Sequence, residues 1–104
     1  MADLNQNQWR EKLQKDNDAV IIDVRTDEEI AEGYIPGAQK INVQDSVAFY
    51  EKAQKLDPNK NYYIYCHAGG RSALACAILN SVGIENTYNL LGGICEWEGE
   101  IITD

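Results

Sequence analysis

The chain contains 104 residues, which is the length of one domain, so we expect a single domain over residues 1–104. Hydrophobic residues make up 44% of the sequence and charged residues 25%, a composition typical of a folded globular protein and not of a disordered chain. Nine basic residues against seventeen acidic ones give a formal net charge of −8. Such a surface repels phosphate backbones and anionic lipid, which argues against nucleic acid and membranes as partners.

The three cysteines, Cys66, Cys76 and Cys95, cannot all form disulfides within one chain, and no two have the Cys-x-x-Cys spacing. Together with a single histidine they offer too few clustered ligands for zinc, so we expect no metal site. The first residues lack a signal-peptide pattern, and the longest apolar run, residues 73–79, is too short to span a bilayer. These features predict a reducing, cytoplasmic location.

The first third of the chain alternates helical and β-rich patterns. Residues 5–15 have the apolar spacing of an amphipathic helix, and residues 19–24 form a β-branched run of the kind that is buried on both faces of a parallel sheet. Thr26 and Glu29 have the spacing of a helix capping box, and Gly33 is placed to end that short helix.

The alternation continues through the middle of the chain. Residues 35–38 have the chemistry of a turn, and residues 40–43 predict a short strand. A third helix is expected to begin after a cap at Asp45 or Ser46 and to run to about residue 56, where an Asp-Pro-Asn sequence stops it.

The last part of the chain repeats the pattern. Residues 62–65 predict a strand packed on both sides, residues 71–82 predict an apolar helix, and residues 87–90 predict another strand before a final helical segment that holds Trp97. Repeated alternation of strand and helix predicts an α/β fold, with a parallel sheet and helices on both faces.

The turn between the strand at 62–65 and the helix at 71–82 has the chemistry of an active site. Cys66 lies just before a helix N-terminus, where the macrodipole and free backbone N–H groups lower the pKa of a thiol. Gly69 and Gly70 allow the loop to curve so that its N–H groups form an anion-binding nest. Arg71 is expected either to add a positive charge to the site or to hold the loop in place through the hydrogen bonds of its guanidinium group. No Lys-Ser or Lys-Thr follows the glycines, which excludes a phosphate-binding loop of the NTPase type.

These residues carry a resemblance to a known family. Residues 66–72, Cys-His-Ala-Gly-Gly-Arg-Ser, resemble the active-site loop of single-domain rhodaneses, which are sulfurtransferases. Residues 20–25 resemble that family's strand ending in Asp-Val-Arg, residues 33–38 resemble its Gly-His-Ile-Pro-Gly-Ala turn, and residues 91–99 resemble its C-terminal signature. The resemblance implies a rhodanese-like α/β fold with a central parallel sheet of four to five strands.

The resemblance also implies a function, thiosulfate sulfurtransferase activity without a metal or organic cofactor. Cys66 takes a sulfane sulfur from thiosulfate or a persulfide, and passes it to cyanide, a thiol or a protein. Asp23 and Arg25 would support the site. The expected binding shell is the rest of the loop, namely His67, Ala68, Gly69, Gly70, Arg71 and Ser72.

Two departures from the family pattern bear on the donor. His67 stands where many rhodaneses have arginine, and Tyr34 stands where histidine is common. With a net charge of −8, the missing cation predicts weak capture of free thiosulfate and leaves the physiological donor open, with a persulfide on a protein or a small thiol as one candidate. We expect His67 to contact the loop rather than to transfer protons.

Other interpretations remain open. The chain could be a non-catalytic rhodanese-like module that binds a partner or senses oxidation through Cys66. A phosphatase is disfavoured, because phosphatases of this kind have five residues between cysteine and arginine, and four separate Cys66 from Arg71. Cys76 is expected to pack in the core, and Cys95 is expected to take no part in the chemistry.

Overall fold

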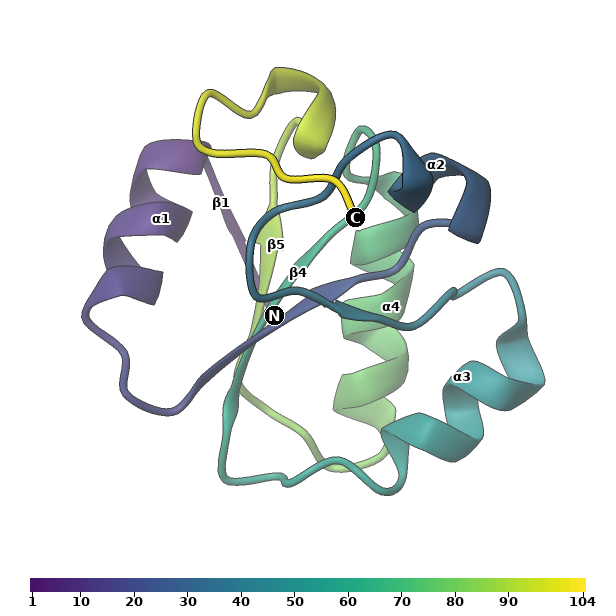
Figure 1. Cartoon of the computed structure of the whole chain (residues 1–104). Coiled ribbons are helices and arrows are strands. Elements are labelled where there is room, and N and C mark those ends of the chain that lie inside the picture. Colours follow the sequence, from purple (N-terminus) through teal and green to yellow (C-terminus); the bar gives the residue numbers. More distant parts are fainter.

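The computed structural model describes all residues from 1 to 104 and shows one five-stranded sheet in which all strands are parallel (Figure 1). The strand order is β1-β5-β4-β2-β3, so β4 is central and β1 and β3 form the edges. The strands are β1 (Ala2–Leu4), β2 (Ala19–Asp23), β3 (Gln39–Lys40), β4 (Asn61–Tyr65) and β5 (Thr87–Leu90). The predicted parallel sheet of four to five strands is confirmed.

Helices cover both faces of the sheet, as the alternating pattern predicted (Figure 1). On one face, α1 (Gln6–Gln14) buries Trp9 against the aromatic side chains of β4. On the other face, α3 (Ser46–Ala53) and α4 (Gly70–Ser81) pack on the β-branched residues of β2 and β4. Because β4 has a packed layer on each side, the chain that leaves its carboxyl end is held rigidly.

Three local predictions are confirmed. Thr26 caps α2 (Asp27–Ala31) by accepting the backbone N–H of Glu29, whose carboxylate accepts the Thr26 N–H in return. This capping box lies at the carboxyl edge of the sheet, because α2 follows directly from β2. The helix over 70–81 and the strand over 87–90 also form where the sequence placed them.

Three local predictions need correction, and one strand is not predicted at all. The strand β1 was missed, because three residues with an exposed Asp3 at their centre have no β-pattern and form a strand only by pairing with β5. The strand expected at 40–43 lies at Gln39–Lys40 instead, although the Ile41 N–H still donates to the Asp23 carbonyl at 3.0 Å and the Val43 N–H to the Val24 carbonyl at 3.1 Å. The final helical segment is a short 3-10 helix, η1 (Ile94–Glu96), that ends just before Trp97. The expected third helix also ends earlier, at Ala53.

No helix in the structure is long and apolar enough to cross a membrane.

Candidate active site

Cys66 lies immediately after the central strand β4, at the carboxyl end of the sheet. Its side chain is fully buried under the loop that leads into α4, which begins at Gly70. In open parallel sheets, binding sites form outside the carboxyl ends of the strands. The thiol therefore lies where the sequence placed it, between a strand end and a helix N-terminus.

The backbone of the loop curves around the sulfur. The Gly69 N–H donates a hydrogen bond to the Cys66 Sγ at 3.0 Å. Gly69 has a φ of +113°, a conformation that side chains disfavour, and this left-handed residue turns the loop into the first turn of α4. The loop therefore needs a glycine at position 69, because its left-handed backbone lets the loop curve and directs the Gly69 N–H at the sulfur.

The environment of Cys66 lowers its thiol pKa below the ordinary value, although burial alone raises it. Burial is the largest single influence and disfavours the thiolate. The Ser72 hydroxyl and the backbone N–H groups of Ser72, Gly69 and Ala68 act in the opposite direction, and together they outweigh it. The loop is therefore built to hold a negative charge on the sulfur.

The Arg71 side chain reaches α2. Its two terminal nitrogens lie 2.6 and 2.8 Å from the two carboxylate oxygens of Glu29, a bidentate ion pair. The pairing holds the pKa of Glu29 down at about 2, mainly through the hydrogen bond from Arg71. Of the two roles considered for Arg71, this geometry favours locking the loop, and the cation already has its counter-ion.

The segment after β5 supports the loop from the other side. The Ile94 N–H donates to the Cys66 carbonyl at 3.0 Å, and the Cys95 N–H donates to the His67 carbonyl at 2.9 Å. Gly93 is pressed so closely on the same peptide that an added Cβ would lie 2.3 Å from the His67 carbonyl oxygen. Gly93 thus brings two backbone segments together where no side chain fits.

Asp23 and Arg25 form a buried ion pair at the end of β2, with Arg25 Nη2 2.7 Å from an Asp23 carboxylate oxygen. The same nitrogen donates to the Gly33 carbonyl at 2.7 Å. Neither side chain forms a hydrogen bond with the 66–72 loop. Their support is indirect, since Arg25 fixes the backbone around α2, which carries Glu29.

The remaining residues named from the sequence fall into two groups. His67, Ala68 and Gly70 are exposed at the top of the loop. Cys76 is buried in the core, and burial raises its pKa to about 11, in agreement with a packing role. Cys95 carries an exposed free thiol.

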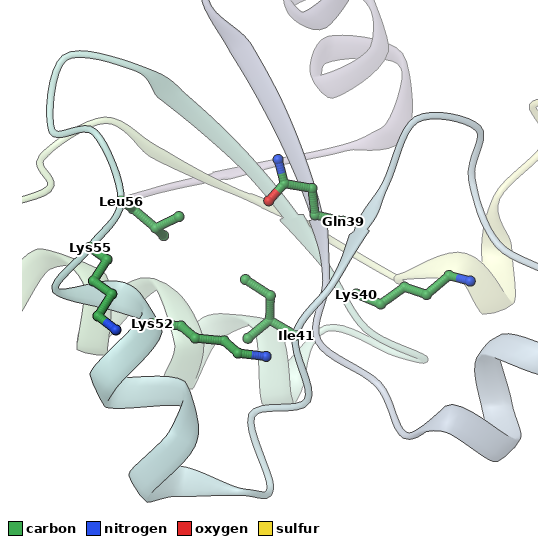
Figure 2. A pocket seen from close by; sticks show the side chains of 6 residues that line it. All are labelled: Gln39, Lys40, Ile41, Lys52, Lys55 and Leu56. Atoms are coloured by element: carbon green, nitrogen blue, oxygen red, sulfur yellow. The ribbon is translucent and has the colours of Figure 1, made fainter.

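The cavity shown in Figure 2 lies away from this loop. It holds about 320 Å³ between β3 and α3 and is lined by Gln39, Lys40, Ile41, Lys52, Lys55 and Leu56. The Lys40 ammonium points away from it and pairs with Asp104 at 3.0 Å (Figure 2). These side chains include no thiol, and none of them belongs to the loop around Cys66, so we do not place the chemistry there. No group of three or more metal-ligating side chains is present either.

Three residues near Cys66 were not assigned to the site from the sequence. Glu29 was interpreted only as part of a helix cap, while Asn89 and Asp3 were not considered. Asn89 is a polar residue in a short buried strand, a pattern that signals a hydrogen-bonded role. Asp3 gave no such signal, since only the pairing of β1 with β5 brings it near.

Comparison with known proteins agrees with this geometry. The sequence profile of the family described as "Rhodanese-like domain" matches residues 6–100. The chain is 43% identical over 91 residues to the "Putative sulfurtransferase YtwF" of Bacillus subtilis, covering 88% of this chain and 84% of that protein. It is 34% identical over 92 residues to a "tRNA uridine(34) hydroxylase" of Teredinibacter turnerae, covering 86% of this chain but only 29% of that protein.

The fold comparison points the same way. The crystal structure of a rhodanese-like domain protein from Staphylococcus aureus superimposes with a TM-score of 0.84 at 33% identity, covering 100% of this chain and 99% of the other. A relative named sulfurtransferase and a whole-chain match in fold together support sulfur transfer in general.

Proposed function

Since the chain belongs to the rhodanese-like family, we propose that it is a sulfurtransferase in which Cys66 cycles between thiolate and persulfide. The observation that carries the proposal is the buried sulfur of Cys66 with the Gly69 amide aimed at it. Donors arranged in this way stabilise a negative charge on sulfur in either state, as thiolate or as terminal persulfide.

The proposed reaction has two steps. The Cys66 thiolate attacks the outer sulfur of a donor and forms an S–S bond, while the bond within the donor breaks and its electron pair leaves with sulfite or a thiolate. An acceptor, such as cyanide or a thiolate, then attacks the outer sulfur of the persulfide and releases the Cys66 thiolate. Dividing one transfer into two displacements at sulfur is covalent catalysis, and it needs no metal or organic cofactor.

We propose that the donor is a persulfide rather than free thiosulfate. The only cation of the loop, Arg71, is paired with Glu29, and the position after the nucleophile is His67. A dianion approaching a chain of net charge −8 finds no uncommitted positive side chain on this loop. A persulfide on a small thiol or on a partner protein carries less charge and meets less repulsion.

The pattern of free cysteines supports a reducing, cytoplasmic setting. All three thiols are free, and the proposed cycle needs Cys66 in its reduced form. A protein partner that delivers or receives the sulfur is part of the same proposal. His67, Ala68 and Gly70, exposed at the top of the loop, are the groups such a partner would contact.

Intact mass spectrometry tests the proposal. The protein is incubated with thiosulfate or with a low-molecular-weight persulfide, and we expect one added sulfur atom that cyanide removes. Cys66→Ser should abolish the adduct, and Cys95→Ser should retain it. If no donor produces an adduct, the chain is a binding or redox-sensing module instead. Hydrolysis of a chromogenic aryl phosphate should be negligible, because the loop has four residues between Cys66 and Arg71.

A further inference from the structure

A chain of buried polar side chains lies behind the nucleophile. The Ser72 Oγ lies 3.4 Å from the Cys66 Sγ and also donates to the Asn89 Oδ1. The Asn89 Nδ2 in turn lies 3.0 Å from a carboxylate oxygen of Asp3 on β1. Ser72 and Asn89 are both fully enclosed in the core, and only Asp3 reaches solvent. Buried polar groups are nearly always hydrogen-bonded, because leaving one without a partner costs folding free energy.

The orientation of the Asn89 amide is fixed by its neighbours. Its Nδ2 faces two acceptors, the Asp3 carboxylate at 3.0 Å and the Gly69 carbonyl oxygen at 3.3 Å. A flipped amide would place its oxygen against both of them, and neither has a proton to offer. The Oδ1 therefore faces Ser72, where it can only accept a hydrogen bond.

Ser72 has one hydroxyl proton and several acceptors within reach. The Asn89 Oδ1 accepts it, the Gly69 carbonyl oxygen lies 3.1 Å from the hydroxyl, and the Cys66 sulfur lies 3.4 Å from it. When Cys66 is a thiol, its S–H can donate to the Ser72 oxygen while the Ser72 proton stays with Asn89. When Cys66 is a thiolate, the sulfur competes for the same proton.

We infer that Asn89 is a positioning residue, which sets the direction of the Ser72 hydroxyl proton and thereby the readiness of Cys66 to become a thiolate. Asn89 and the sulfur compete for one donor, so Asn89 restrains ionisation of the free thiol. Ser72 can still donate a hydrogen bond to the sulfur when an acceptor takes the outer sulfur of the persulfide and Cys66 leaves as a thiolate. Asp3 holds the Asn89 amide in place from β1.

Other charged groups around the loop come from several elements. Asp3 belongs to β1, Asp23 and Arg25 lie at the end of β2, Glu29 of α2 pairs with Arg71 of α4, and Glu96 of η1 lies on Gly92. His67 and Cys95 are the titratable groups beside them. A substitution at Asn89 adds or removes no charge, and among these groups only the exposed Asp3 loses a hydrogen-bond partner.

The experiment follows the ultraviolet absorbance of the Cys66 thiolate against pH in a Cys95→Ser background. Cys76 does not interfere, because burial raises its pKa to about 11. Asn89→Leu removes the competing acceptor, and we expect the titration midpoint to fall by roughly half a pH unit, about a threefold change in the ionisation constant. Ser72→Ala removes the donor, and the midpoint should rise by about one unit.

The decisive comparison is the double variant. In Ser72→Ala the asparagine loses its route through the hydroxyl and keeps only its 3.3 Å contact with the Gly69 carbonyl oxygen, so adding Asn89→Leu should move the midpoint much less than it does in the parent protein. An effect of Asn89→Leu that persists undiminished without Ser72, or a midpoint that rises or stays constant in the single variant, overturns the inference. A purely structural role would lower the melting temperature and leave the midpoint alone, which also counts against it.

Replacing Asn89 leaves no backbone group without a hydrogen-bond partner. Without Asn89, the Gly69 carbonyl oxygen still accepts the Ala73 N–H at 3.2 Å, and Asp3 is hydrated at the surface. If leucine disturbs the packing, Asn89→Ala removes the same oxygen without added bulk, and the same fall in the midpoint is expected. The inference rests on the nucleophilic role proposed for Cys66, but the titration measures ionisation alone, so it can fail or hold independently of the sulfur-transfer assay.

Discussion

Arg71 places its two terminal nitrogens on the two carboxylate oxygens of Glu29, at 2.6 and 2.8 Å, and so joins the first turn of α4 to α2. Glu29 at the same time completes the helix cap with Thr26. One carboxylate therefore serves both the local structure of α2 and the loop that surrounds Cys66. The ion pair also leaves the loop without an uncommitted cation, and this has measurable consequences for donor choice.

Removing the negative charge of Glu29 should improve the capture of thiosulfate. In Glu29→Gln the guanidinium of Arg71 loses its counter-ion but keeps a hydrogen-bond acceptor, so its charge becomes available to a dianion. We expect the thiosulfate KM to fall about threefold, equivalent to roughly 0.7 kcal/mol of added attraction. Glu28→Gln is the matched control, because Glu28 is exposed on the same helix and changes the net charge equally. An equal KM in both variants would show that Arg71 does not contribute to donor binding.

The same ion pair should make stability depend on pH in the acid range. The folded protein holds the pKa of Glu29 at about 2, against a reference value of 4.5, mainly through the hydrogen bond from Arg71. A lowered pKa contributes stability above the reference value and loses it as the pH falls from about 4.5 toward 2. The melting temperature of the parent protein should therefore exceed that of Glu29→Gln near neutral pH, and the difference should shrink steadily through this window. A constant difference would contradict the assignment.

A positive charge placed directly after the nucleophile should also favour thiosulfate. His67 is exposed at the top of the loop, so His67→Arg adds a cation beside the buried sulfur with little effect on packing. We expect the thiosulfate KM to fall about three- to tenfold, the effect of roughly 1 kcal/mol of attraction. The control His67→Gln should keep the parent KM. A thiosulfate KM that is the same in the arginine variant and in the parent would argue against the persulfide preference proposed above.

Gly93 should tolerate no side chain. A Cβ at this position would lie 2.3 Å from the His67 carbonyl oxygen, so Gly93→Ala has to displace the active-site loop. We expect a loss of about 2–4 kcal/mol in the free energy of unfolding, and lower sulfur transfer by the remaining folded protein. Gly83→Ala is the control, since Gly83 also has a positive φ but no atoms within 4 Å of its Cβ position. That change should cost about 1 kcal/mol and spare activity, as urea titrations and assays at low temperature can show.

The buried pair of Asp23 and Arg25 should matter for stability rather than for donor binding. Arg25→Met leaves the Asp23 carboxylate buried without its partner, and such losses cost about 3–5 kcal/mol. The KM for a persulfide donor should be unchanged in the folded fraction, because neither side chain forms a hydrogen bond with the loop. Lys15→Met removes the exposed pair with Glu11 and should have no measurable effect on urea unfolding. A raised KM in Arg25→Met would instead assign the pair to the site.

Much of this protein is determined by its sequence. The β-branched run at 19–24, the capping box of Thr26 and Glu29, and the apolar segment at 71–82 are local signals, and each formed the element that its pattern predicted. The placement of Cys66 also followed from local order, because a nucleophile between a strand and a helix must lie at the carboxyl end of a parallel sheet.

The partners of the loop were decided only by the tertiary structure. Arg71 was visible in the sequence as a lone cation, but its pairing with Glu29 depends on the distance between α2 and α4, which no local pattern encodes. Asn89 lies near the nucleophile because β5 pairs with β4, and Asp3 reaches Asn89, 86 residues away along the chain, because β1 pairs with β5 at the edge of the sheet. Charge and hydrogen bonding act through space, so the sequence identified the nucleophile and the fold decided what surrounds it.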